Sequence, residues 1–222
     1  MDKRRLFKDV RTIFFDYDGC LHDSMAIYAP AFNRAYDFLV RTGKAEPREW
    51  RDDEISRWLG LNCIEMWEAF LPGADDDTRS QCMQIIKEAQ KELIEQGRAV
   101  LYPGALEALS YLKGKGYRLV FISNCRKYYM DGHAKAFGLD AYFDELACSE
   151  GYGAVPKHEI LRRVKERYPM DMAIVGDRAL DMEAGRANGI HTIGCSYGFA
   201  REGELDGADA VISDITELKE YF

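Results

Sequence analysis

Residues 14–24 read F-F-D-Y-D-G-C-L-H-D-S, and this stretch decides how the rest of the chain is interpreted. An apolar run over residues 10–15 ends abruptly at Asp16, and a second carboxylate and a glycine follow at Asp18 and Gly19. A short apolar run of this kind is typical of a buried strand. Two carboxylates on the tight turn after it can crowd one small charged centre, and phosphoryl transfer through an aspartyl-phosphate needs that arrangement.

The composition of the chain excludes some partners. Its 222 residues allow one large domain, or a core domain with a small insert, and an apolar fraction of 47% is enough for a real core. The net charge of −8 argues against nonspecific nucleic-acid binding, which needs a basic face. An anionic substrate must therefore be attracted by local cations, because the overall field repels it.

The cysteines and the N-terminus indicate a cellular compartment. The six cysteines form no C-x-x-C pair and show no zinc spacing, so we expect free thiols in a reducing environment. The basic residues 3–5 are not followed by an apolar segment, and no apolar run is long enough to span a bilayer. We therefore expect a cytoplasmic protein with no membrane partner.

The stretch from about residue 24 to residue 97 is typical of helices throughout. The expected helices run over 24–41, from Pro47 to just before Gly60, over 62–71 and from the acidic run 75–77 to 96. Ser24 is expected to cap the first of these helices with its side chain, and Pro47 to lie in the first turn of the second.

From Tyr102 onward the pattern changes to strands alternating with helices. Strands are expected over 118–123, 146–148, 172–176, 192–195 and 209–212, and helices over 103–115, 127–137, 156–168, 180–188 and 214–222. Short, fully apolar strands between amphipathic helices indicate a parallel sheet covered on both faces.

The economical interpretation is an α/β protein with one Rossmann-like parallel-sheet core and an inserted all-helical cap. The core would comprise residues 1–23 and 99–222, and the cap residues 24–98. Two independent domains in tandem would leave the first strand alone at the N-terminus, unable to bury its faces.

Functional side chains gather where the expected strands end. Asp16 and Asp18 follow the first strand, Ser123 and Asn124 end the strand over 118–123, and Asp177 and Asp181 follow the strand over 172–176, while Lys157 begins a helix between the last two groups. In an open parallel sheet the carboxyl ends of the strands form one edge, so we expect these groups to converge.

Each of these residue types suits one task in phosphoryl transfer. Asp16 is the candidate nucleophile on phosphorus, and Asp18 is the candidate general acid and base. Backbone amides of the turn loosened by Gly19 can form an anion nest. Ser123 can donate to a phosphoryl oxygen, and Lys157 can neutralise negative charge on the aspartate and the transferring group.

The same edge predicts a metal site with oxygen ligands only. Asp177 would complete it together with Asp16 and the backbone carbonyl of Asp18, and Asp181 would orient a metal-bound water. Mg²⁺ prefers such a set of hard donors.

These residues resemble, in sequence order, the four motifs of the haloacid dehalogenase-like (HAD) superfamily. Residues 16–20 match the D-x-D-x-T/V pattern of motif I, with Cys20 in place of Thr or Val. Ser123 with Asn124 is similar to motif II, Lys157 to motif III, and residues 176–181 to the G-D-x-x-x-D pattern of motif IV. The stretch after motif IV is similar to the phosphoglycolate phosphatase-like branch, and the resemblance covers nearly the whole chain, including a helical cap.

Four residues are candidate substrate contacts. Gly19 and Asn124 belong to the motifs, and Asn62 and His22 lie outside them. Asn62 lies where related caps present a specificity loop. His22 lies in the linker toward the cap and could meet the substrate, but an ordinary loop histidine is at least as consistent with its position.

The resemblance implies a Mg²⁺-dependent phosphoric monoester hydrolase that acts on a small phosphorylated metabolite, a phosphoglycolate-like phosphomonoester, through phospho-Asp16. The oligomeric state expected is a monomer or a homodimer. One alternative is a phosphomutase of the same superfamily, which would share every catalytic residue. The other is a weakly active relative that binds a phosphorylated ligand, and Cys20 is the feature that favours it.

Overall fold

The structure is a computed structural model, and it describes residues 5–168 and 171–222. Residues 1–4, 169 and 170 lie outside the described residues. Residues 1–4 belong to the expected core range 1–23 and to the N-terminus that is expected to lack a secretory signal.

A parallel sheet of six strands forms the centre of the described chain, in the order β3-β2-β1-β4-β5-β6. The strands are β1 (Thr12–Phe15), β2 (Arg118–Ser123), β3 (Glu145–Cys148), β4 (Met172–Gly176), β5 (His191–Cys195) and β6 (Ala210–Ile212). Phe15 at the end of β1 pairs with Phe121 of β2 and with Val175 of β4, and β2 and β4 end within two residues of these partners.

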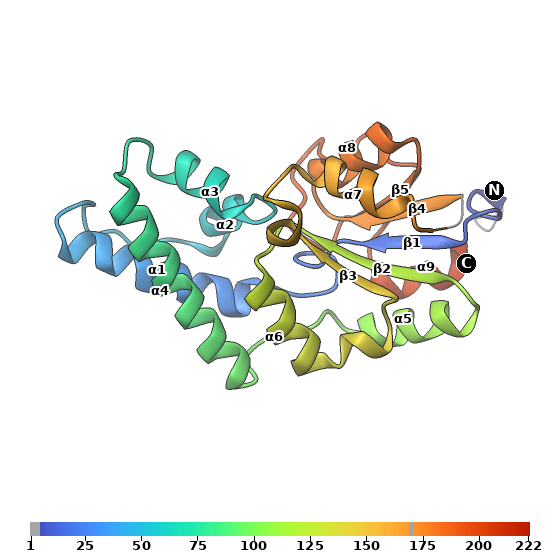
Figure 1. Ribbon diagram of the computed structural model, residues 1–222, viewed down its shortest axis with the longest axis horizontal. Helices are drawn as coiled ribbons and strands as arrows, with labels where there is room; N and C mark the ends of the chain where they lie inside the picture. Colours follow the sequence, from blue (N-terminus) through green and yellow to red (C-terminus); the bar gives the residue numbers. More distant parts are fainter. Residues whose placement is uncertain (1–4, 169–170) are drawn as a thin grey trace.

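Helices cover both faces of this sheet. They are α1 (Met25–Arg41), α2 (Asp52–Ile55), α3 (Cys63–Phe70), α4 (Asp76–Glu95), α5 (Ala105–Gly114), α6 (Lys127–Phe137), α7 (Lys157–Lys165), α8 (Ala179–Asn188) and α9 (Leu218–Tyr221). Figure 1 shows α7 and α8 on one face and α5, α6 and α9 on the other, as the two hydrophobic clusters beside the sheet require. Within the described residues, no helix combines the length and the apolarity needed to cross a membrane.

The α/β class with a parallel, Rossmann-like sheet is confirmed. The expected strands over 118–123 and 172–176 and the expected helix over 127–137 match β2, β4 and α6 in their bounds. The expected helix over 214–222 is a 3₁₀ turn at residues 215–217 followed by the short helix α9.

The expectation that a helix begins near Pro47 is wrong, because α2 begins only at Asp52. The segment before it is fixed by side-chain packing. The Trp50 ring packs edge-on against Phe32 and Tyr36, and the Tyr36 hydroxyl donates a hydrogen bond to the carbonyl oxygen of Glu46. These tertiary contacts outweigh the weak local preference for a helix.

The four helices α1–α4 lie beyond the carboxyl ends of the strands, to the left of the sheet in Figure 1. They pack around a hydrophobic cluster of their own, in which Phe32, Leu39, Ile55 and Trp67 are almost fully buried. The far end of α4 leaves that cluster, and its residues Leu93 and Ile94 belong to the cluster beside the sheet, where α4 packs against α6. The division into a core over 1–23 and 99–222 and a cap over 24–98 stays a prediction.

The first prediction concerns the core that supports the strand ends. Phe121 is fully buried in β2 and packs against Tyr17 and Phe143. Phe121→Ala should lower the free energy of unfolding by about 3–5 kcal/mol, through lost burial and the cavity left behind. Val211→Ala is the control, since Val211 is 48% exposed in β6 and should change stability by less than about 0.5 kcal/mol. Chemical denaturation of both variants measures the two effects, and equal losses would contradict this account of the core.

Candidate active site

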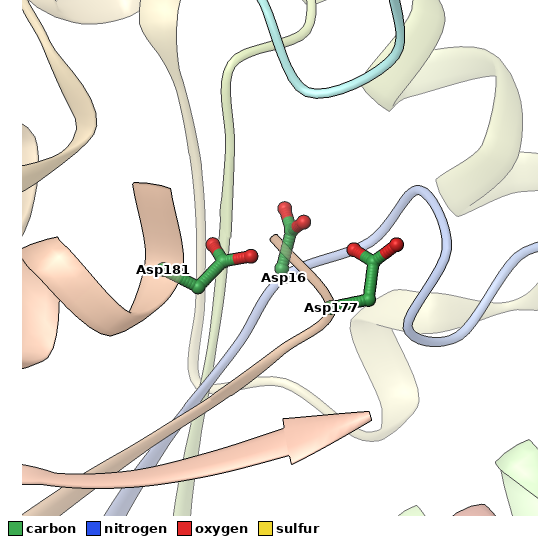
Figure 2. A group of neighbouring side chains, drawn as sticks. All are labelled: Asp16, Asp177 and Asp181. Carbon is green, nitrogen blue, oxygen red and sulfur yellow. The ribbon is translucent and has the colours of Figure 1, made fainter. Parts of the chain in front are cut away.

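Three carboxylates from two strand ends meet at the edge of the sheet. Asp16 follows β1, Asp177 follows β4, and Asp181 lies in the first turn of α8. One oxygen from each lies within 4.8 Å of the others, and all three side chains are buried. Figure 2 shows the three carboxylates turned toward the same space. The sequence prediction that these strand ends converge agrees with this geometry.

Lys157, the first residue of α7, supplies a buried positive charge to this group. Its Nζ lies 2.7 Å from Asp16 Oδ1 and 2.6 Å from Asp181 Oδ1. The other oxygen of Asp181 accepts a hydrogen bond from the backbone amide of Arg178. Both oxygens of Asp181 thus accept hydrogen bonds from the protein, and its expected role in orienting a metal-bound water stays a prediction.

The ammonium group of Lys157 lies beside this group of three carboxylates, so these four side chains together carry a net negative charge when all of them are ionised. Burial, and then the charge of Asp181, raise the pKa of Asp16 to about 7, although Lys157 opposes the shift. Burial, and then the charges of Asp16 and Asp181, hold the pKa of Asp177 well above its usual range. Buried like charges stabilise the protonated forms in this way unless a further cation is present.

The donor set suits a small hard cation. Asp177 Oδ2 accepts a hydrogen bond from the backbone amide of Phe199 at 2.6 Å, whereas Asp177 Oδ1 is buried and has no hydrogen-bond partner among the described residues. The group contains carboxylate oxygens and no sulfur or imidazole ligand. Such a set fits Mg²⁺. The side chain of Asp18 is not part of the group, and the expected contribution of its backbone carbonyl stays a prediction.

Asp18 is held by three hydrogen-bond donors on its Oδ1 atom. Ser24 Oγ lies at 2.6 Å, the Tyr129 hydroxyl at 2.7 Å and His22 Nδ1 at 3.2 Å. Burial raises the pKa of Asp18, but the hydrogen bonds and charge of His22 and the bonds from Ser24 and Tyr129 outweigh it, so the pKa lies below its usual value. The structure therefore presents Asp18 as a proton acceptor.

His22 does not reach the pocket, which corrects its expected role as a substrate contact. The ring is fully buried, stacks on Tyr17 and lies 4.5 Å, centroid to centroid, from His133. It is absent from the lining of the cavity described below. The ring is held in this position because its Nδ1 atom bonds the carboxylate of Asp18.

Ser24 stands before α1 as expected, but its side chain does not cap the helix. Its backbone is already helical (φ −69°, ψ −20°), whereas a capping residue is extended and accepts from the first amides, and its hydroxyl donates to Asp18.

Asn62 is also placed differently from the expected substrate contact. Its side-chain oxygen accepts hydrogen bonds from the backbone amides of Ile64 and Glu65 and so caps α3, while Glu65 bonds back to the amide of Asn62. The residue is 9% exposed and does not line the cavity. This is a capping box, whose sequence signature was present in the chain.

Gly19 has a structural reason to be glycine. Its φ is +83°, and a Cβ there would lie 2.1 Å from Asp177 Oδ2. Its amide donates to the carbonyl oxygen of His22, so this amide is used within the turn and does not serve the expected anion nest. Cys20 is fully buried beside it and donates a weak hydrogen bond to the carbonyl oxygen of Val175, so the turn accommodates the cysteine.

A cavity opens from this group toward the helices α1–α4. Asp16, Asp18, Ser123, Asn124 and Lys157 line its inner end. Asn124 Nδ2 donates to the carbonyl oxygen of Gly60 at 2.8 Å, so Asn124 is bound to the loop that closes the cavity. Tyr129, which lines the cavity and bonds Asp18, is a site residue that sequence analysis missed.

Comparisons with known proteins agree with this geometry. A family model described as haloacid dehalogenase-like hydrolase matches residues 10–189. A phosphoglycolate phosphatase of Nitrosospira multiformis is 30% identical, covering 94% of this chain and 93% of that protein. A phosphoglycolate phosphatase of Escherichia coli K12 is 25% identical over 96% of this chain and 92% of its own length. A haloacid dehalogenase-like hydrolase from Streptococcus pneumoniae superposes with a TM-score of 0.79 at 22% identity, covering 97% and 99% of the two chains, which shows the same fold.

The role of Asn62 can be tested by two substitutions. Asn62→Ala removes the cap of α3 and should lower the free energy of unfolding by about 0.5–2 kcal/mol. Asn62→Asp keeps a capping oxygen and should retain the stability of the natural chain. Its kcat/KM for 4-nitrophenyl phosphate should also stay within twofold. A large loss of kcat/KM in the folded Asp variant would instead indicate that Asn62 meets the anionic substrate.

Proposed function

Because this chain belongs to the haloacid dehalogenase-like hydrolases and is a phosphoric monoester hydrolase similar to the phosphoglycolate phosphatases, we propose that it is a Mg²⁺-dependent phosphatase acting through phospho-Asp16. The single observation that supports this most is the buried group of Asp16, Asp177 and Asp181, whose one ion-pair partner among the described residues is Lys157. The net negative charge of these side chains suits the binding of a divalent cation together with a phosphoryl group.

In the first step, a carboxylate oxygen of Asp16 attacks phosphorus, and the bond from phosphorus to the leaving oxygen breaks. The leaving oxygen takes a proton from Asp18, which must bind that proton when the substrate arrives. Lys157, 2.7 Å from Asp16, offsets part of the negative charge that gathers during the transfer. Ser123, which lines the same end of the cavity, donates a hydrogen bond from its hydroxyl to a phosphoryl oxygen and keeps its proton.

In the second step, Asp18 takes a proton from water, and the water oxygen attacks phosphorus. The bond to Asp16 breaks, and inorganic phosphate leaves. The hydrogen bonds from Ser24, Tyr129 and His22 keep Asp18 ionised and pointed at one place, which suits this role.

The metal would be held by Asp16 and Asp177, with the backbone carbonyl of Asp18 as a further donor. When bound, Mg²⁺ screens the negative charges of the carboxylates and the phosphoryl group. The substrate would be a small phosphomonoester, and the names of the relatives make 2-phosphoglycolate the first compound to assay.

Metal dependence is the next prediction. Chelation followed by dialysis should reduce phosphate release to background, and Mg²⁺ should restore it, because the carboxylates otherwise repel the phosphoryl group. Asp177→Asn should raise the Mg²⁺ concentration for half-maximal activity at least tenfold. Asp131→Asn, at an exposed carboxylate paired with Lys127, is the control and should change nothing. Full activity in a metal-free preparation would rule out this role for the metal.

The two acids should fail in different ways. Asp16→Asn should abolish turnover and leave no phosphorylated protein. Asp18→Asn should slow turnover by about 10²–10⁴-fold, because proton transfer is lost. With 4-nitrophenyl phosphate, whose leaving group needs no proton, the Asp18 variant should release about one equivalent of nitrophenol rapidly and accumulate phosphorylated protein. Rapid-quench kinetics and mass spectrometry measure both. Near-normal turnover in Asp16→Asn would refute the covalent mechanism.

A further inference from the structure

We propose that the substrate of this site carries a bulky apolar leaving group, an aromatic or aliphatic alcohol, and no second anionic group. The inference rests on the proposed function, because it assumes that the phosphoryl group lies beside Asp16 and Lys157. It concerns the far end of the same cavity, which the four motifs do not determine.

The cavity has two chemically different ends. Asp16, Asp18, Ser123 and Lys157 line the inner end, where phosphorus would lie. The wall supplied by α3, α4 and the loop before α3 is mostly apolar, and its main members are Trp58, Leu61, Met66, Trp67, Met83 and Ile86. A mostly apolar wall with a few polar groups at one end is typical of sites that bind small molecules.

Charge is scarce in this wall. Beyond the three charged groups of the inner end, Arg126 is the one charged side chain among the described residues that line the cavity. It is paired with Glu150 at 3.1 Å, and the two side chains are 40% and 44% exposed, which places the pair at the solvent side. Gln90, a buried polar group in the wall, already accepts a hydrogen bond from the Tyr128 hydroxyl.

A leaving group with a carboxylate would therefore lose its hydration and find no free cation. The one available guanidinium would have to give up Glu150, so the exchange gains little, whereas an unpaired buried carboxylate is strongly unfavourable. An apolar leaving group meets the opposite situation, because its transfer from water to this wall is favourable in proportion to the area buried.

The apolar wall is built before any ligand arrives. Trp67 and Met66 are 1% and 5% exposed and belong to the hydrophobic cluster of α1–α4, so their positions are fixed by packing. The loop at Leu59 and Gly60 is held over the cavity by hydrogen bonds from Arg178 and Asn124. Met83, which lines the cavity and is only partly buried, adds a surface that adapts to different apolar shapes.

The test uses the full chain with Mg²⁺ and a series of primary phosphomonoesters: ethyl, butyl and 2-phenylethyl phosphate, with 2-phosphoglycolate. Their leaving groups are all primary alcohols, so the series varies mainly in apolar size and charge. We expect kcat/KM to rise at least tenfold from ethyl to 2-phenylethyl phosphate. The value for 2-phosphoglycolate should lie at least tenfold below that for 2-phenylethyl phosphate.

The outcomes separate the two proposals. Hydrolysis that is lost in Asp16→Asn but is fastest with 2-phosphoglycolate or ethyl phosphate would overturn the inference and leave the proposed function standing. No Asp16-dependent hydrolysis of any ester would overturn both.

A charge placed in the wall gives a second, independent measurement. Leu61 lines the cavity and is only partly buried, so Leu61→Arg should fold, and it should shift the ratio of kcat/KM for 2-phosphoglycolate over 2-phenylethyl phosphate at least tenfold toward the acid. Ile64→Arg is the matched control, since Ile64 is 53% exposed, lies in the adjacent helix α3 and does not line the cavity. Thermal unfolding verifies that both variants are folded, and an unchanged ratio in a folded Leu61→Arg chain would contradict the inference. The ester series with the natural chain decides the matter if that variant does not fold.

Discussion

A single buried ammonium group, that of Lys157, joins Asp16 to Asp181, and the arrangement of the whole site depends on this pair of contacts. Removing charges from water is costly, and a buried carboxylate without a partner is more costly still. Asp177 is only half satisfied, because its Oδ2 atom accepts a hydrogen bond from Phe199 while its Oδ1 atom is buried without a hydrogen-bond partner among the described residues. The ends of β1 and β4 hold this unfavourable group in place. Stability alone does not explain it, whereas the proposed binding of a cation and a phosphoryl group accounts for it.

The sequence predicted the inner end of the site well for a physical reason. Buried parallel strands are continuous apolar runs, and each run stops where the chain leaves the sheet. The first polar residue after such a run therefore marks the edge, as Asp16 does after β1 and Asp177 after β4. Neighbouring strands in register bring these residues together, and the pairing of β1 with both β2 and β4 does so here.

Contacts between distant parts of the chain could not be predicted in this way. Tyr129 lies 111 positions after Asp18, and no local pattern distinguishes it from the tyrosine before it. The segment at Pro47 carries a helix-start signal, but its conformation is fixed by aromatic packing onto α1. The sequence also does not distinguish a polar side chain that contacts a ligand from one that caps a helix. Asn62 suggested a ligand contact, but its side chain bonds the backbone amides at the start of α3.

The helices α1–α4 and the sheet supply different parts of the cavity wall. Asn124 follows Ser123, Arg178 follows Asp177, and these two side chains bind the carbonyl oxygens of Gly60 and Leu59. The loop that covers the cavity is thus held by the immediate neighbours of two site residues. In the proposed reaction, the sheet supplies the groups that act on phosphorus, while the helices supply the wall that meets the leaving group. Substitutions in that wall can change the preferred alcohol without moving the carboxylates, so one set of motifs is compatible with many substrates.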